Sequence, residues 1–447
     1  MTPTALLAFM NLFPEFRASS WDGWRAVLGR LTDAVREFYA IVGRGAGKSR
    51  IVALLACFFA SRSYPRAPGE SIYIGVFAPD RKQAGITFRY ILGLLRSVPA
   101  LAKLIVSDIR DSIELSNGII IEVVTASIAA PRGRAYALVI VEEGAFLPTD
   151  QSANPDFEIL RSVRPALARV PGSLLAFVSS PYARRGVAWT AYQKHHGQPD
   201  GDVVLLQAST LELNPTFDRR AIEVAYAEDE PAARAEYGGE FRTDLESYVS
   251  SEAIARVVAR GVRERAPLPL DQVDYADFRD PAGGSGGDSD TIAVAHGEER
   301  EDGRVAAVLD LIREAVPPFS PEQVTADFMG AVKPYGVREV VGDRYAGEWP
   351  REACRRHGIE YRVSERTKSE IYSAFLPALN SGRVELLDHP KLLAQLAGLE
   401  RRTGFGGRDA IDHAPRGHDD LINAAAGALL LVLDEAAMAS VPRLEWL

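Results

Sequence analysis

The stretch FYAIVGRGAGKSRIVALLACFFA, residues 38–60, constrains the fold of this chain more than any other. A short apolar strand over 38–43 runs into a glycine-rich turn, and a long apolar helix is predicted over 48–61. In such a turn the backbone N–H groups cradle phosphates, Lys48 reaches the terminal phosphates and Ser49 binds Mg²⁺. The predicted ATP-binding residues are Arg44, Gly45, Ala46, Gly47, Lys48 and Ser49.

This phosphate-binding loop, or P-loop, departs from the usual pattern at one position. The common motif has a glycine five residues before Gly47, where this chain has Val42. The alternative is an ordinary glycine-rich turn whose lysine is solvated. The order of strand, turn and helix favours the P-loop.

A P-loop needs a second strand that ends in acids, one to orient Mg²⁺ and one to activate water. The segment ALVIVEEGAF provides an apolar strand over 137–141, followed by Glu142 and Glu143. We assign Glu142 to the metal and Glu143 to the water. The first acid is more usually aspartate, so Glu142 has to reach the ion with one extra methylene group. The alternative is a strand end that carries two solvated acids.

Two further segments are candidates for work at the γ-phosphate. Arg132 and, less strongly, Arg134 precede the acidic strand, and an arginine there stabilises charge in the transition state. The alternative is that both are surface arginines. The strand over 174–180 ends in a segment expected to sense the γ-phosphate and couple it to movement, unless it is only a turn. The coupling residues are Ser179, Ser180 and Pro181.

The order of predicted elements indicates two different α/β domains. Strands alternate with helices up to residue 205, which is typical of a mostly parallel sheet. The later chain gives three strands, a helix, a strand, a helix, a strand and a final helix, which is the ribonuclease H topology. We predict an N-terminal P-loop (ASCE-type) ATPase domain at 1–205, a helical lid or linker at 206–265, and a ribonuclease H-like nuclease domain at 266–447.

The ribonuclease H topology brings its first strand, fourth strand and final helix together, and acids stand at these places. Asp280 ends the first strand, Asp343 ends the fourth, and Asp419 and Asp420 open the final helix. Clustered carboxylates repel one another, and Mg²⁺ or Mn²⁺ takes oxygen ligands of this kind. Two such ions about 3.5–4 Å apart clamp the attacking and leaving oxygens of a phosphodiester. His418 either orients a ligand or is structural.

Each of these acids also has a simpler explanation. Asp280 precedes Pro281 and could only start a turn, while Asp288 and Asp290 compete with it for the same role. Asp343 could only end its strand. One of the two acids at the final helix could cap that helix while the other binds metal.

Composition limits the class of protein. Apolar residues make up 47% of the 447 residues, enough for sizeable cores, and the net charge of −9 does not suggest nucleic-acid binding except through a local basic face. Cys57 and Cys354 fit no metal-binding spacing and favour a reducing cytoplasm. The longest apolar runs fall short of the ~20 residues that span a membrane, and the N-terminus lacks the basic opening of a signal peptide.

Taken in order, these motifs resemble the large terminase subunit of tailed bacteriophages. The resemblance covers nearly the whole chain and implies an ATPase that drives double-stranded DNA into proheads, and a metal-dependent endonuclease that cuts concatemers. It implies ATP and Mg²⁺ or Mn²⁺ as cofactors, and a place in the host cytoplasm, docked transiently on the prohead. It is carried by VGRGAGKS, VIVEEGAF, VSSP, DPAGGSGGDSD, VGDRYAGEW, ERTKSEIY and GHDDLINA.

The resemblance also implies partners and two residue roles. The partners are the portal protein, a small terminase subunit and other copies of the chain, in a pentameric ring on the portal or as a monomer in solution. It favours Arg132 as an arginine finger acting between subunits and places Lys368 near the nuclease site. Candidate phosphate contacts, which are otherwise solvated surface, are Arg184, Arg185, Arg355, Arg356, Arg401 and Arg402.

Two other interpretations stay open. One is a P-loop DNA translocase or helicase whose C-terminal part is a non-catalytic DNA-binding module. Common helicases carry two motor cores, and this chain shows one P-loop. The other is a stand-alone nuclease with a degenerate nucleotide site.

Overall fold

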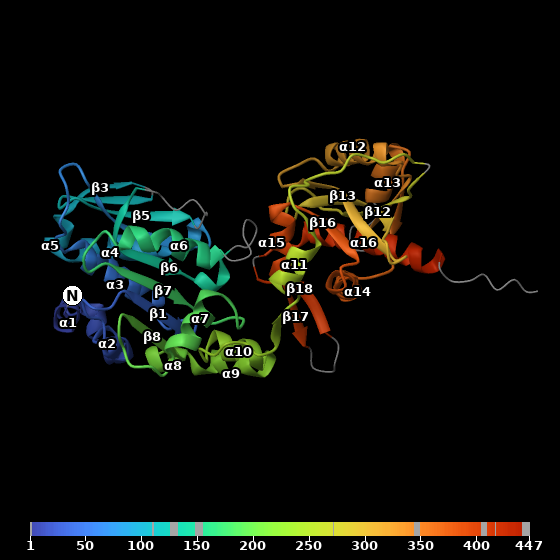
Figure 1. Ribbon diagram of the computed structural model, residues 1–447. Coiled ribbons are helices and arrows are strands. Elements are labelled where there is room, and N and C mark those ends of the chain that lie inside the picture. The colour runs from blue at the N-terminus through green and yellow to red at the C-terminus, as the bar shows by residue number, and fades with distance from the viewer. Residues whose placement is uncertain are drawn as a thin grey trace, which may run out of the picture. The chain divides into compact units, whose positions relative to one another are not determined.

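The computed structural model describes residues 2–109, 111–125, 133–147, 155–270, 272–343, 349–403, 409–415 and 417–439. The chain forms two compact units (Figure 1). Unit 1 comprises Met1–Pro148 and Asn154–Leu245, and unit 2 comprises Thr149–Ala153 and Glu246–Leu447.

Unit 1 is built on an eight-stranded sheet (Figure 1). Every neighbouring pair from β5 to β8 is parallel, and β4 and β3 add an antiparallel edge. In sheet order the strands are β3 (Ile105–Ile109), β4 (Ser112–Leu115), β5 (Ile119–Thr125), β2 (Ile72–Ala78), β6 (Ala135–Glu142), β7 (Leu174–Ser179), β1 (Glu37–Val42) and β8 (Val203–Ala208).

Helices cover both faces of this sheet, as a parallel sheet with near-continuous apolar strands requires. Every residue of β6 and of β7 is buried. Alternate residues of β1 face two different cores, one under α3 and α4 and the other under α6 and α7. The helices of unit 1 are α1 (Pro3–Met10), α2 (Asp22–Leu28), α3 (Lys48–Ala60), α4 (Arg81–Ser97), α5 (Pro99–Ala102), α6 (Pro155–Leu167), α7 (Gly186–His195), α8 (Thr210–Leu213), α9 (Arg219–Glu228) and α10 (Glu230–Glu236).

The strand order places β7 between the glycine-turn strand β1 and the acid-bearing strand β6. This interposed strand is the order expected of the ASCE type of P-loop fold. Strand β8 crosses residue 205, where the sequence places a domain end, and it pairs with β1 along its whole length. Residues 206–245 belong to unit 1 and residues 246–265 to unit 2.

Unit 2 is built on a seven-stranded mixed sheet. β11, β12 and β13 are antiparallel neighbours, and β14 and β15 continue parallel to β11. The order β13-β12-β11-β14-β15 is the ribonuclease H arrangement. In sheet order the strands are β10 (Val258–Ala259), β16 (Val384–Leu387), β13 (Val305–Ala315), β12 (Asp290–Glu299), β11 (Tyr275–Asp280), β14 (Glu339–Gly342) and β15 (Glu360–Val363).

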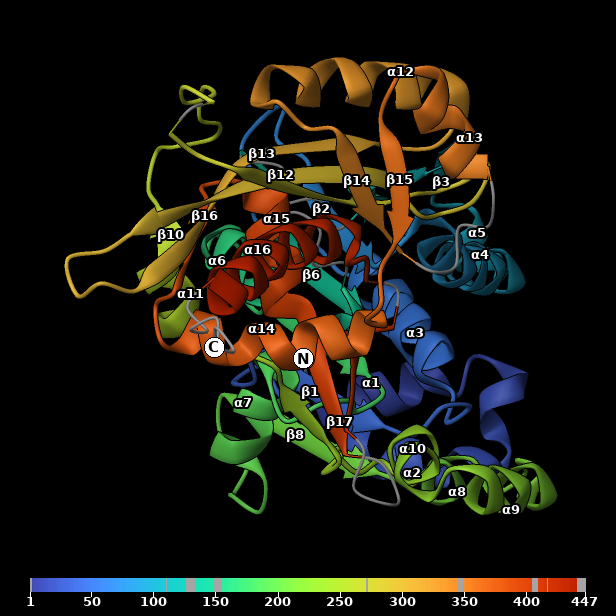
Figure 2. The same cartoon turned by 90° about the vertical axis from the view of Figure 1, so that its right-hand side faces the viewer.

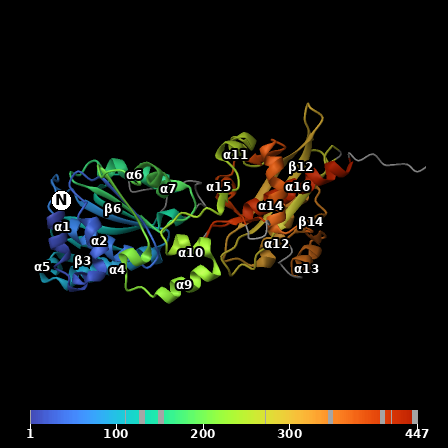
Figure 3. The ribbon, with the colours of Figure 1, turned by 90° about the horizontal axis from the view of Figure 1, so that it is seen from below.

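Two helical layers enclose the unit 2 sheet. Figure 2 shows α12 and α16 on opposite faces of it, and α14 lies beside α16 (Figure 3). A small second sheet joins β9 (Leu245–Ser247), β17 (Leu399–Thr403) and β18 (Asp409–His413). The helices are α11 (Ser251–Val257), α12 (Pro321–Val332), α13 (Trp349–Arg356), α14 (Lys368–Asn380), α15 (Pro390–Gly398) and α16 (Asp420–Ala439). The α/β prediction for both halves of the chain is confirmed.

Helix α16 is the core helix of unit 2. By length and composition it could cross a membrane, and 67% of its most apolar window is buried inside the protein. It packs against β11, β12 and β13, and Gly427 lets it approach closely, because a Cβ there would lie 2.3 Å from the ring of Phe278. Packing in the core therefore accounts for its apolar sequence.

A fully buried ion pair lies on the sheet face opposite α16. Arg279 Nε and Nη2 donate to the two carboxylate oxygens of Asp290 at 2.9 and 2.8 Å, and both side chains are 0% exposed. Strand alternation puts Arg279 and its neighbour Asp280 on opposite faces. Asp290 is therefore bound to arginine on the far face and does not share the place of Asp280.

We expect Asp290→Asn to lower the free energy of unfolding by about 3–5 kcal/mol, because Arg279 is left buried without a counter-charge. Urea denaturation followed by circular dichroism measures this. The control is Asp302→Asn, since Asp302 is exposed on the turn between β12 and β13. An unfolding midpoint that stays at the wild-type value in Asp290→Asn contradicts the prediction.

Candidate functional site

The glycine-rich turn between β1 and α3 has a shape that only glycine permits at two positions. Gly45 and Gly47 have φ angles of 79° and 92°. A Cβ on Gly45 would lie 2.3 Å from the Phe217 ring, and one on Gly47 would lie 2.9 Å from the Trp21 ring. The turn is therefore moulded by side chains that come from distant parts of unit 1.

Side chains also fix which way the peptide groups of this turn point. Trp24, Thr210 and Asn214 each donate to one carbonyl oxygen of residues 44–46, at 2.6, 2.8 and 2.9 Å. With these carbonyls bound to protein, and with the first amides of α3 lacking a partner inside their helix, amide N–H groups are left for an anion. The donors Thr210 and Asn214 lie in the region that the sequence assigns to a lid or linker.

The P-loop lysine is buried among the residues predicted for catalysis and coupling. Lys48 is 8% exposed, and its Nζ lies 2.8 Å from Ser180 Oγ and 3.5 Å from Glu143 Oε1. Glu143 Oε2 accepts from the Ser180 amide at 3.2 Å, and Ser179 Oγ accepts from the Ala145 amide at 3.2 Å. The buried Pro181 follows. The structure thus brings the ends of β6 and β7 to the P-loop.

Glu143 has a strained backbone, with φ 46° and ψ 43°. It is the one non-glycine residue with positive φ in the part of the chain that the structure describes. Such outliers persist where the surroundings enforce them and gather at active sites. This strain turns the Glu143 carboxylate toward Lys48.

Glu142, the last residue of β6, is 1% exposed. Burial raises the pKa of its carboxyl, and hydrogen bonds from Thr87 and Ser49 act in the opposite direction. The structure therefore places Glu142 next to Ser49, as the proposed magnesium site requires. Sequence reasoning missed Thr87, whose only signal is a hydroxyl in the apolar stripe of α4.

The arginines predicted near the γ-phosphate have different outcomes. Arg132 lies outside the described residues. Arg134 forms an ion pair with Glu122 at 2.7 Å and its guanidinium lies over the Tyr73 ring. Arg44 is 70% exposed and forms an ion pair with Glu236 at 2.8 Å.

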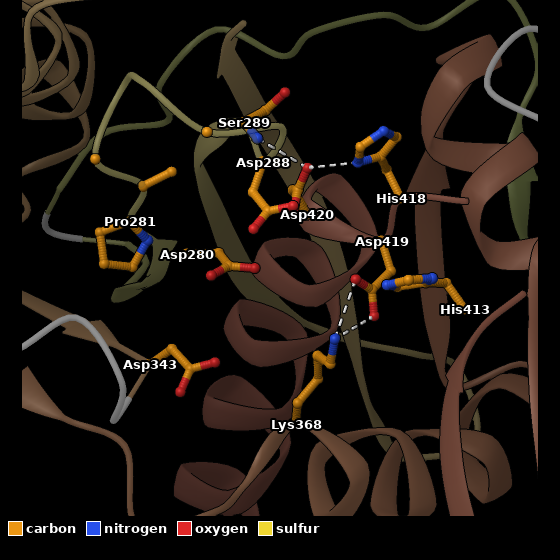
Figure 4. Close-up of a pocket in the computed structure, with 13 residues that line it drawn as sticks. Asp280, Pro281, Asp288, Ser289, Asp343, Lys368, His413, His418, Asp419 and Asp420 are labelled. Atoms are coloured by element: carbon orange, nitrogen blue, oxygen red, sulfur yellow. Dashed lines mark hydrogen bonds and ion pairs between the residues drawn. The ribbon is translucent and has the colours of Figure 1, made fainter. Parts of the chain in front are cut away.

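In unit 2, all four predicted aspartates line one pocket of about 470 Å³ (Figure 4). Asp280 ends β11 and Asp343 follows β14, and these strands are parallel neighbours, so their ends meet. Asp419 and Asp420 stand at the start of α16. The remaining lining residues are Pro281, Ala282, Gly283, Gly286, Asp288, Ser289, Lys368, His413 and His418.

The electrostatics of this pocket favour a bound cation. Burial raises the pKa of Asp280 well above its usual range, and repulsion by Asp420, Asp343 and Asp419 adds to this against one hydrogen bond from Asn423 at 2.8 Å. Burial also raises the pKa of Asp420 to about 6, although the Ser289 amide donates to it at 3.0 Å. Oxygen ligands from three elements that repel one another fit divalent ions such as Mg²⁺ or Mn²⁺.

The aspartates at α16 are not needed to cap the helix. The amides of Leu421 and Ile422 donate to Gln395 Oε1 at 2.9 and 3.2 Å, and Gln395 is 2% exposed. The side chain of Gln395 does the capping that the sequence left to one of the two acids. Both Asp419 and Asp420 therefore have carboxylates free of that role.

We expect Gln395→Leu to lower the free energy of unfolding by about 1–3 kcal/mol, because two buried N–H groups lose their acceptor. Chemical denaturation measures the change. Gln323→Leu on the exposed surface of α12 is the matched control and should stay within about 0.5 kcal/mol of wild type. Equal stabilities of the two variants would refute the capping role.

A lysine and two residues of β18 extend the acidic pocket. Lys368 Nζ lies 3.0 Å from Asp419 Oδ2 and 3.2 Å from Asp412 Oδ1, and Tyr372 donates to Asp419 at 2.9 Å. Burial lowers the pKa of Lys368, but attraction to Asp419 and Asp412 outweighs burial and the net shift is upward. Potential ligand atoms of Asp412, His413 and Asp419 lie within 4.8 Å of one another.

Sequence reasoning missed Asp412 and His413. The only signal was the segment IDH shortly before the predicted helix. His418 lines the pocket with its Nδ1 4.0 Å from Asp420 Oδ2, beyond hydrogen-bond distance. Among the described residues, none of the six arginines expected to contact phosphates lines this pocket.

No family model and no curated protein matches this chain. Similar solved structures include the large terminase of bacteriophage HK97, at 14% identity over 91% of this chain and 93% of that chain, with a TM-score of 0.40. The large terminase of a thermophilic bacteriophage, solved in complex with ADP, is 12% identical over 96% and 98%, TM-score 0.41. The large terminase nuclease of the thermophilic phage G20c with bound magnesium is 17% identical over 41% and 96%, TM-score 0.33.

Proposed function

We propose that this chain is a large terminase subunit: an ATP-driven motor that moves double-stranded viral DNA into proheads, and a metal-dependent endonuclease that cuts concatemeric DNA. The observation that carries the proposal is the presence of two separately built sites in one chain. Unit 1 joins a P-loop to a pair of strand-end glutamates, and unit 2 gathers four aspartates around one pocket.

For the first site we propose ATP as the substrate and one Mg²⁺ as its partner. The turn amides and Lys48 bind the phosphates, Ser49 and Glu142 hold the ion, and Glu143 orients and deprotonates the attacking water. Lys48 now bonds Ser180, so a bound phosphate competes with that hydroxyl for its ammonium group. This competition gives residues Ser179, Ser180 and Pro181 a route by which to register the nucleotide.

For the second site we propose hydrolysis of a DNA phosphodiester. Asp280, Asp343 and Asp420 face the pocket as metal ligands, and Asp419 is held at its edge by Lys368. Two divalent ions bound there would stabilise the attacking and leaving oxygens. The chain itself supplies the carboxylates, their orientation through Asn423 and the Ser289 amide, and the pocket that admits the DNA backbone.

The proposal extends to partners. Arg132 acts as the arginine finger of a neighbouring subunit in a ring docked on the portal protein, and a small terminase subunit helps to select DNA. The protein then works in the host cytoplasm and is absent from the mature virion. The support for these partners is the resemblance of the sequence motifs.

The main alternative is a DNA translocase with a non-catalytic binding module in unit 2. An acidic pocket argues against it, because carboxylates repel the phosphates of DNA unless cations stand between them. The second alternative is a stand-alone nuclease with a degenerate nucleotide site. The buried contacts of Lys48 and Glu142 argue against that, since a site out of use has no need for them.

The test uses the purified full chain with linear double-stranded DNA. We expect ATP hydrolysis that DNA stimulates, and plasmid cleavage that requires Mg²⁺ or Mn²⁺. With proheads and the small subunit, DNA becomes protected from added nuclease. Cleavage without ATP turnover would favour the stand-alone nuclease, and ATP turnover without cleavage would favour the translocase with a binding module.

A further inference from the structure

Glu142 is held from a helix that the P-loop motif does not include. Thr87 of α4 is 0% exposed and its hydroxyl donates to Glu142 Oε2 at 2.5 Å. Glu142 also accepts a hydrogen bond from Ser49, the second residue of α3. One carboxylate therefore ties together the ends of β6 and α3 and the middle of α4.

The position of Thr87 in its helix makes this bond unusual. The buried stripe of α4 consists of Ala84, Phe88, Ile91, Leu94 and Leu95, with Thr87 among them. An apolar residue at this place would pack against the sheet at no cost, whereas a buried hydroxyl must find a partner. In a helix that partner is often the carbonyl four residues earlier. Here it is the carboxylate.

The bond matters because Glu142 stands where P-loop proteins more usually have aspartate. The glutamate side chain has one more rotatable bond, so its carboxylate is less well fixed on the strand. A hydrogen bond to Oε2 removes that freedom and leaves Oε1 as the oxygen available to an ion. It also favours the ionised form of a carboxyl that burial drives toward neutrality.

We propose that Thr87 is a positioning residue for the magnesium site of unit 1, and that its hydroxyl is what allows glutamate to serve there in place of aspartate. The inference rests on the proposed ATPase function. Outer-shell partners of this kind typically change metal affinity by about 10–100-fold when they are removed.

The test measures Mg²⁺ dependence of nucleotide binding, with fluorescent ADP as the probe and the full chain. Thr87→Val keeps the shape of the side chain and deletes the hydroxyl, while Thr87→Ser keeps the hydroxyl. We expect Thr87→Val to raise the Mg²⁺ concentration at half-maximal effect by about tenfold. Thr87→Ser stays near wild type, and ADP binding in EDTA is the same in all three proteins.

The matched control is Thr190→Val. Thr190 is also a helical threonine of unit 1, and its hydroxyl bonds the Gly186 carbonyl at 2.9 Å, far from the P-loop in sequence. A merely structural loss would weaken ADP binding in EDTA as well. Thr87→Val with wild-type Mg²⁺ dependence would overturn the proposal.

A double-mutant cycle covers the case in which Thr87→Val folds poorly. Glu142→Asp withdraws the carboxylate by one methylene, so we expect Thr87→Ser and wild-type Thr87 to differ from each other no more in that background than in the parent, and Thr87→Ala to add no further loss. Additive losses would overturn the role of Thr87. If wild type itself binds no ADP, the proposed ATPase function fails, whatever the Thr87 variants show.

Discussion

Lys48→Ala is expected to reduce ATP hydrolysis by about 10²–10³-fold, the usual cost of deleting one charge-stabilising donor from an active site. Lys48 is buried at the start of α3, and its ammonium lies between Ser180 and Glu143. Among the described residues of unit 1, Lys48 is the cation that forms an ion pair with Glu143. Steady-state phosphate release, with and without DNA, measures the loss.

The same variant should cut plasmid DNA at the wild-type rate. Every residue that lines the acidic pocket lies between Asp280 and Asp420, within unit 2. Lys103→Ala, at an exposed position after α5, is the control for loss of a positive charge from unit 1. Loss of cleavage in a folded Lys48→Ala protein would contradict two separable sites.

Asp280→Asn is expected to reduce metal-dependent cleavage by about 10³-fold or more, since a metal ion stabilises the transition state by several kcal/mol. Asparagine has the same size and can still accept the hydrogen bond from Asn423. ATP hydrolysis should remain at the wild-type rate. Conversion of supercoiled plasmid to nicked and linear forms in MnCl₂ measures the nuclease activity. Residual cleavage within a few-fold of wild type would contradict the role of Asp280.

The same substitution should change how the stability of the metal-free protein depends on pH. The pKa of Asp280 lies well above normal in the folded protein, and that of Asp420 is about 6. A carboxyl whose folded pKa is raised binds its proton more tightly when folded. Its contribution to stability is therefore greatest below about pH 4 and is lost as pH rises through the folded pKa. For Asp420 the loss is on the order of 3 kcal/mol.

We therefore expect the melting temperature of unit 2 in EDTA to fall between about pH 5 and about pH 8, and MnCl₂ to restore it. Asp280→Asn should melt higher than wild type in EDTA at the upper pH, because one repelling charge is gone. Scanning calorimetry measures both effects, with Asp302→Asn as the control. A metal-free melting temperature that ignores pH and the Asp280 substitution would count against the carboxylate cluster.

The sequence predicted those site residues that punctuate regular elements. Lys48 begins a helix, Glu142 ends a buried strand, and Asp280 ends another. Apolar periodicity locates such element ends, and parallel neighbours bring their ends to one edge of a sheet. That is why Asp280 and Asp343, far apart in sequence, could be placed together from the sequence alone.

The residues that were missed act across elements, and nothing local marks them. Thr87 and Gln395 each sit in an otherwise apolar helix face, so periodicity counts them as exceptions. Asp412 belongs to the β17–β18 hairpin, which has no clear alternation of apolar residues. The boundary expected at residue 205 falls inside β8 for a similar reason, because a short edge strand is recognised mainly by its pairing with β1.

The most direct test of two separable sites is a paired assay on wild type, Lys48→Ala and Asp280→Asn. ATP hydrolysis and plasmid cleavage in MnCl₂ are measured on the same preparations. We predict a crossed pattern, in which Lys48→Ala loses only hydrolysis and Asp280→Asn loses only cleavage. Either variant losing both activities while it remains folded, or a wild type that lacks one of them, would contradict the account.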